Sequence, residues 1–285
     1  MTLTKGSFSH APHLNCRQQP HGQCHAVFPR AACNASGRFH RTGQPRRLFV
    51  EQLPAIKPYL FKQTGLADTP ATLREALCAA PWDFNTFQQV SDMSFRPETY
   101  FPFLQSLYDL ARTLAPQAQI VLYQTWAYRV DAPDLAEYGL TQTQMHAQLT
   151  AAYDTAARTL GCRVLPVGDA FARARVLLGY HPDPTYDFAH ATPYALPCQT
   201  GSLIAGYDWA TGNTASGHAE LQMDGRHGNA LGCYLAAAVW YEMFTGLSIG
   251  KNPFCPAEIT KDAQAVVQLA ARQAMQACGG PLGKE

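Results

Sequence analysis

The run "AQIVLYQTW" at 118–126 is rich in β-forming residues and predicts a buried strand. The segment before it, 96–116, has apolar residues at helical spacing and predicts a helix. The segment after it, 141–161, predicts a second helix that opens with the capping-box pair Thr141 and Gln144. A strand between two helices of this length is the unit from which parallel sheets are built.

The same alternation continues toward both ends of the chain. Strands are also predicted at 82–87 and 162–168, and helices at 169–179, 229–245 and 257–277. This order indicates an α/β fold with a mainly parallel sheet and helices on both faces. We expect 82–87, 118–126 and 163–167 to be adjacent parallel strands, with ligands at their carboxyl ends. Residues 180–222 are rich in Pro, Gly and Thr and are expected to form long loops.

Size and composition suit one domain over residues 1–285. The chain is 47% hydrophobic with a net charge of +1, which argues against nucleic acid as the main partner. The sequence has no run of 18 apolar residues, so it predicts no membrane-spanning helix. The N-terminus lacks the apolar core of a secretory signal. Nine cysteines without regular spacing argue against a disulfide framework. The chain as it stands is therefore expected to be cytoplasmic.

Residues 10–65 are atypical. Residues 1–50 contain no Asp or Glu and show no helical or strand period. A disrupted reading frame and an Arg-rich targeting segment both remain open as explanations. The segment holds a Cys/His cluster whose spacing matches no zinc pattern, so no metal is expected there; its members are Cys16, His21, Cys24, His25 and Cys33. The chain has no phosphate loop and no dinucleotide fingerprint, so no cofactor is expected either.

Two Asp-x-x-His motifs are candidates for catalysis, "DFAH" at 187–190 and "DGRH" at 224–227. The first lies in a Pro-punctuated loop, whereas the second leads into a helix that begins at Asn229, a good N-cap residue. A carboxylate held against imidazole Nδ1 leaves the other ring nitrogen free to take a proton from a nucleophile. The second motif, Asp224 and His227, is therefore preferred.

A third motif, "GLSIG" at 246–250, matches the G-x-S-x-G nucleophile elbow. That elbow needs a strand before it and a helix after it, but here a helix comes first. We therefore interpret Gly246 as a helix C-cap and do not expect Ser248 to be catalytic.

Residues 72–277 resemble the SGNH/GDSL hydrolase superfamily, closest to a bacterial branch of largely uncharacterised members. The resemblance is carried by "TLREALCAAPWDFNTFQQVSDMSFRPETY", "APQAQIVLYQTWAYR", "LTAAYDTAARTLGCRVLPVGDAF" and "DGRHGNALGCYLAAAVWYEMFTG". It implies a three-layer α/β/α sandwich, with a flavodoxin-like sheet of about five strands, and ester hydrolysis by a serine. Asp224 and His227 fall where the superfamily keeps its C-terminal Asp and His.

The resemblance also implies a nucleophile and an oxyanion hole. In "LTKGSFSHAPHL" at 3–14 the superfamily pattern lacks one residue, and both alignments make Ser7 the nucleophile, with Ser9 as the alternative. Residues 1–6 would then form a strand beside 82–87. Gly37 would supply one oxyanion donor, and Gln88 or Gln89 would supply an amide in place of the usual Asn.

The function expected from these residues is hydrolysis of a small-molecule ester by Ser7, His227 and Asp224, without metal or cofactor. A carbohydrate ester is one substrate class that the superfamily suggests. The alternative is a catalytically silent SGNH-fold protein, or the product of a disrupted gene, that binds small molecules without turnover. The degenerate nucleophile block favours the alternative, and the intact Asp224–His227 pair opposes it.

Overall fold

The computed structural model describes residues 15–18, 24–27, 33–34, 59–61, 69–71, 73–78, 81–210 and 219–282. Its central sheet has four parallel strands in the order β3–β6–β7–β8. They are β3 (Cys33–Asn34), β6 (Phe84–Phe87), β7 (Gln119–Tyr123) and β8 (Arg163–Leu165). The prediction that the last three are adjacent and parallel is confirmed.

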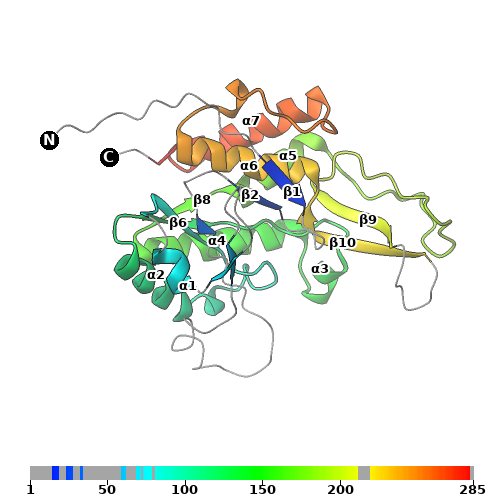
Figure 1. Cartoon of the computed structure of the whole chain (residues 1–285). Helices are drawn as coiled ribbons and strands as arrows, with labels where there is room; N and C mark the ends of the chain where they lie inside the picture. Colours follow the sequence, from blue (N-terminus) through cyan, green and yellow to red (C-terminus); the bar gives the residue numbers. More distant parts are fainter. Residues whose placement is uncertain are drawn as a thin grey trace.

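Alternation along β7 divides the core into two. Val121 and Tyr123 pack on one face of the sheet with helices α5, α6 and α7. Ile120 and Leu122 pack on the other face with α1, α2 and α4. Figure 1 shows the two groups of helices on opposite sides of the sheet. These helices are α1 (Leu73–Cys78), α2 (Phe103–Leu114), α4 (Gln142–Leu160), α5 (Val167–Leu178), α6 (Ala230–Thr245) and α7 (Lys261–Ala277).

The fold is therefore an α/β sandwich of three layers, as expected. The strands of its sheet are short, since β7 ends at Tyr123 rather than at 126. Four parallel strands of this sheet lie within the described residues, whereas the resemblance implies about five; the strand expected over residues 1–6 lies outside the described residues.

Capping residues place the helices as the sequence predicts. Thr141 and Gln144 form the reciprocal capping box of α4. The Asn229 side chain accepts a hydrogen bond from the Gly232 N–H and starts α6. Gly246 ends α6 in the left-handed conformation, so Ser248 follows a helix and lies on no strand-to-helix elbow.

Two helices begin later than predicted, and two short helices, α1 and α3, were not predicted. Pro97 starts the short 3-10 helix η1 (Pro97–Thr99), and α2 begins only at Phe103 because Pro102 lacks an N–H for a helix interior. Thr260 caps α7, so that helix starts at Lys261 rather than at 257. The short helix α3 (Pro133–Glu137) follows the loop after β7.

The prediction of loops throughout 180–222 is wrong. Strands β9 (Ile204–Ala210) and β10 (Glu220–Gly228) form an antiparallel pair that contains Asp224 and His227. The Gly and Asp residues in "IAGYDWA" hide the alternation by which β9 would be recognised. Short antiparallel pairs also form where the N-terminal region shows no strand period: β1 (Asn15–Gln18) with β2 (Cys24–Val27), and β4 (Tyr59–Phe61) with β5 (Thr69–Ala71).

Within the described ranges, no helix has the length and apolar character needed to cross a bilayer. Cys233 is disulfide-bonded. The free cysteines among the described residues are Cys78, Cys162, Cys198, Cys255 and Cys278.

Candidate active site

Asp224 and His227 form a compact hydrogen-bonded pair on β10. His227 Nδ1 lies 2.8 Å from Asp224 Oδ2. The other carboxylate oxygen accepts the backbone N–H groups of Arg226 and His227, each at 3.0 Å. The strand register shifts between Asp224 and Gly228, and this irregularity brings both N–H groups to the same carboxylate. The imidazole orientation is thus set at Nδ1, and none of the described residues hydrogen-bonds to Nε2.

The carboxylate of Asp224 is ionised at neutral pH. Partial burial disfavours its charge, but the hydrogen bonds from the His227 ring and from the two backbone N–H groups outweigh burial and lower the pKa to about 2. An ionised carboxylate at Nδ1 stabilises the imidazolium that forms when Nε2 takes a proton.

The loop after β7 is hydrogen-bonded to the Asp224–His227 segment of β10. The Trp126 indole N–H donates to the Arg226 carbonyl at 2.9 Å, and the Arg129 N–H donates to the Gly225 carbonyl at 2.8 Å. Trp126 is itself fixed, since its ring stacks on Phe171 with centroids 4.4 Å apart and planes 4° apart. The segment is therefore anchored at the carboxyl end of β7, where α/β folds place their ligands.

A second chain of contacts links β10 to the loop after β6. The guanidinium of Arg226 pairs with Asp134 and lies 5.2 Å from the centroid of the Tyr128 ring. The Tyr128 hydroxyl lies 3.2 Å from Ser91 Oγ and donates to it. Ser91 is two positions after Gln89 and three after Gln88, so these contacts bring both glutamines to the same edge of the sheet as His227.

Arg129 connects the loop after β7 to the β9–β10 hairpin and to the loop before β9. Its side chain is only 2% exposed, and Nε lies 2.9 Å from Asp131 Oδ1 as an ion pair outside hydrogen-bond geometry. Nη1 donates to Gln199 Oε1, and Nη2 donates to the Tyr180 hydroxyl. The positioning roles of Arg129 and Trp126 were missed in the sequence. The signal that points to them is a Trp and an Arg in "QTWAYR", directly after a predicted strand.

The two candidate oxyanion glutamines differ in what they already bind. The Gln89 amide nitrogen donates to the hydroxyl and the carbonyl of Thr99, at 3.1 and 3.2 Å. Its backbone N–H donates to the Tyr153 hydroxyl at 3.1 Å. The Gln88 side chain is half-buried and has no hydrogen-bond partner in the described part of the chain. Of the two side-chain amides, only that of Gln88 has no hydrogen-bond partner among the described residues.

The competing pair, Asp187 and His190, has the same internal geometry. His190 Nδ1 lies 2.8 Å from Asp187 Oδ2, as in the first pair. The difference is exposure: the His190 and Asp187 side chains are 86% and 62% exposed, against 36% and 38% for His227 and Asp224. The hydrogen bond alone therefore does not distinguish the pairs, whereas anchoring and burial do.

The remaining candidates fall outside the described residues. They are Ser7, the alternative Ser9, Gly37 and the expected strand over 1–6. The side chains of the N-terminal Cys/His cluster also lie outside the described residues. Within the described ranges, no group of three or more His, Cys, Asp or Glu side chains is placed to hold a metal ion.

No family model matches the chain, and no curated protein sequence matches it. Two solved structures are similar. A DUF4886 family protein from Bacteroides uniformis ATCC 8492 is 23% identical with a TM-score of 0.59, over 80% of this chain and 77% of that chain. A protein from Slackia heliotrinireducens, provisionally described as an SGNH hydrolase, is 23% identical with a TM-score of 0.38, over 59% of this chain and 68% of that chain. The first similarity supports the fold alone.

The lowered pKa of Asp224 predicts a pH-dependent contribution to stability. Its contribution should be fully present above the ordinary value of 3.8 and should be lost as the pH falls toward about 2. In Asp224→Asn, urea unfolding should therefore show a stability deficit at pH 7 that shrinks between pH 4 and the acid limit. Asp187→Asn, in the exposed pair, should produce a much smaller deficit at pH 7. A deficit in Asp224→Asn that is independent of pH would contradict the expectation.

Proposed function

We propose that this protein is a serine hydrolase that cleaves an ester, with His227 as the general base and Asp224 as its orienting carboxylate. The observation that carries the proposal is the anchored Asp224–His227 pair, in which Nδ1 contacts Asp224 and Nε2 has no hydrogen-bond partner among the described residues. Both residues lie at the carboxyl edge of the sheet, which is where this class of fold holds its chemistry. The silent-fold alternative explains the fold equally well but gives no reason for an imidazole held in this way.

In the proposed reaction, Ser7 Oγ attacks the ester carbonyl while His227 Nε2 takes its proton. The imidazolium formed is stabilised by Asp224 and then returns the proton to the leaving alcohol. A water molecule, activated by the same nitrogen, hydrolyses the acyl-enzyme. Gln88 and the Gly37 N–H are the proposed donors to the oxyanion, and one such donor typically contributes about 3 kcal/mol to transition-state stabilisation. These steps need no metal or cofactor.

Exposed aromatic rings near the hairpin support a carbohydrate as the alcohol part of the ester. Phe188 is 48% exposed and Tyr194 is 69% exposed. The Phe188 ring lies 4.9 Å from the Tyr207 ring, and the Tyr194 ring lies 6.4 Å from the Trp209 ring. Clustered exposed apolar groups of this kind mark binding surfaces. Tyr207 is the register partner of Met223, which precedes Asp224.

A covalent probe identifies the nucleophile. A fluorophosphonate probe should label the full-length protein at Ser7, and Ser7→Ala should lose both the labelling and the hydrolysis of p-nitrophenyl acetate. Labelling should be located by mass spectrometry of the modified peptide. Ser9→Ala is the matched control and should retain both signals. Loss in Ser9→Ala alone would move the nucleophile to Ser9, and absence of labelling in every variant would favour the silent-fold alternative.

A further inference from the structure

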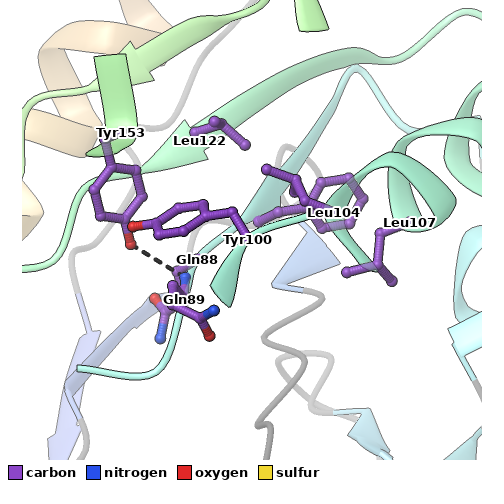
Figure 2. A pocket seen from close by; sticks show the side chains of 8 residues that line it. Gln88, Gln89, Tyr100, Leu104, Leu107, Leu122 and Tyr153 are labelled. Atoms are coloured by element: carbon purple, nitrogen blue, oxygen red, sulfur yellow. Dashed lines mark hydrogen bonds between the residues drawn. The ribbon is translucent and has the colours of Figure 1, made fainter. Parts of the chain in front are cut away.

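The cavity beside Gln88 and Gln89 is too small for a ligand. It encloses about 20 Å³, which is room for about one water molecule. Figure 2 shows Tyr100 and Tyr153 beside the two glutamines, where they line this cavity. A larger ligand needs an exposed surface, and the β9–β10 hairpin offers one.

Five aromatic side chains, here called the ring face, gather on β9 and on the segment that precedes it. The Phe188 ring lies 4.8 Å from the Tyr186 ring and 4.9 Å from the Tyr207 ring. The Tyr194 ring lies 6.4 Å from the Trp209 ring. Figure 1 shows the hairpin extending beyond the layered core. Since Phe188 and Tyr194 are exposed, the ring face is accessible to a ligand.

The ring face is held rigidly. The Tyr186 hydroxyl and the Trp209 indole N–H both donate to the Ala195 carbonyl, at 2.8 and 2.7 Å. Tyr194, the residue before Ala195, has φ +68, a backbone conformation that residues other than glycine rarely adopt. Such strain persists only where the surroundings fix it. Rings fixed in this way lose little conformational entropy when a ligand packs on them.

The charge around the ring face is negative. Residues 176–225 contain five acidic residues and no Lys or Arg, whereas the chain as a whole has a net charge of only +1. Two of the five, Asp187 and Asp208, are exposed, and each lies between two members of the ring face in the sequence. Because like charges repel, this surface disfavours nucleic acid, an anionic membrane and a second copy of itself as the ligand.

The free edge of β9 is closed to an added strand. The Gln199 side chain accepts the Tyr207 N–H at 2.7 Å and donates to the Tyr207 carbonyl at 2.9 Å. Asp208 Oδ1 accepts the Trp209 N–H at 2.8 Å. A peptide that docks by strand addition needs such backbone groups unpaired. A ligand here would therefore be recognised by rings and carboxylates rather than by main-chain pairing.

Exposed rings with carboxylates between them suit a ligand that combines apolar faces with positive charge, since a cation is attracted to both groups. An amino sugar has this combination, because C–H groups cover the faces of its ring and its free amine is protonated. We propose that the ring face binds a chain of amino sugars with free ammonium groups. The inference rests on the proposed function and deepens it, since this chain would be the alcohol part of the ester.

The placement of the ring face on the hairpin fits this role. Tyr207 and Trp209 lie one and three residues along β9 from Gly206, which is the register partner of Asp224. At the usual rise of a strand, three residues span about 10 Å. A bound sugar chain that follows β9 would therefore approach the candidate catalytic pair.

The test is calorimetric titration of the full-length protein with a glucosamine tetramer and with an N-acetylglucosamine tetramer, at pH 6, where the free amine is charged. The two ligands share their sugar rings and differ at the amine. The glucosamine tetramer should bind at least tenfold more tightly, and added salt should weaken its binding because the carboxylates are exposed. Equal Kd values for the two tetramers would overturn the proposal.

Tyr194→Ala should weaken binding of the glucosamine tetramer about two- to fivefold, the effect typical of one exposed ring that faces a cation. Tyr194→Trp should keep the wild-type Kd, whereas Tyr194→Leu should bind as weakly as the alanine variant, since recognition depends on the ring. Leu247→Ala, at an exposed apolar residue after α6, is the matched control and should bind as wild type does. Unchanged binding in Tyr194→Ala would overturn the proposal.

Asp187→Asn removes one charge beside the rings and should weaken binding about twofold or more at low salt. Its matched control is Asp109→Asn, at an exposed carboxylate next to Tyr108 on α2, which should keep the wild-type Kd. Circular dichroism checks that each variant is folded. Equal weakening in the two variants would reflect net charge alone and would overturn the assignment to the ring face.

A lysine tetramer tests the other class of cationic ligand. If it binds more tightly than the glucosamine tetramer, the ring face is a site for a basic peptide and the proposal is overturned. Binding of the glucosamine tetramer without hydrolysis of any ester would leave the ring face as a sugar site while the proposed function fails. Hydrolysis of p-nitrophenyl acetate without binding of the glucosamine tetramer would overturn this inference and leave the proposed function standing.

Discussion

Replacing His227 by alanine should abolish ester hydrolysis, whereas replacing His190 by alanine should leave it unchanged. The two histidines have the same motif and the same 2.8 Å contact with their carboxylates. Only His227 is anchored at the carboxyl edge of the sheet, through the contacts of Trp126 and Arg129 with the residues just before it. A general base must be held rigidly within reach of the proton that it removes.

The expected loss of kcat in His227→Ala is about 10³-fold or more, because loss of one triad member disables the whole unit. The measurement is kcat and KM for p-nitrophenyl acetate in both variants, with KM little changed. Unfolding by urea should show both variants folded, since each histidine is at least one-third exposed. Equal loss in the two variants, or loss in His190→Ala alone, would refute the assignment of the pair.

Replacing Gly206 by alanine should produce the largest loss of stability among the substitutions considered. Gly206 has φ +76, and a Cβ there would lie 1.5 Å from Arg129 Nη1 and 2.0 Å from Gln199 Oε1. Arg129 has little freedom to retreat, because it is 2% exposed and is held by an ion pair and hydrogen bonds. Displacing a buried, paired arginine costs about 3–5 kcal/mol.

Gly246→Ala is the matched control for that substitution. Its φ is +70, but nothing lies within 4 Å of the added Cβ, so only the backbone conformation is strained. That strain costs about 1–2 kcal/mol. Urea unfolding should show a larger fall of the midpoint in Gly206→Ala, with unchanged m-values. Gly206 pairs in register with Asp224, so activity should fall in Gly206→Ala as well. Equal midpoints for the two variants would show that Arg129 does not hold the hairpin.

The sequence by itself determined the layered α/β core. Strands at 82–87, 118–126 and 163–167 are adjacent and parallel as predicted, because buried parallel strands are recognisable as short apolar runs between helices. The capping box of α4 and the N-cap Asn229 were also visible, since capping depends on residues three positions apart. The preference for Asp224 and His227 rested on that same local signal, the helix that follows them.

Only the tertiary structure decided what surrounds that pair. The β9–β10 hairpin was not predicted, because its pairing joins residues on either side of a polar, Gly-containing segment. Asp187 and His190 reproduce the local geometry of Asp224 and His227, so no local pattern separates the two motifs. What separates them is the contact of Arg226 and Gly225 with a loop about 100 residues earlier in the chain. Contacts over such a separation depend on how the whole sheet packs. The spacing of residues that are neighbours in the sequence does not predict that packing.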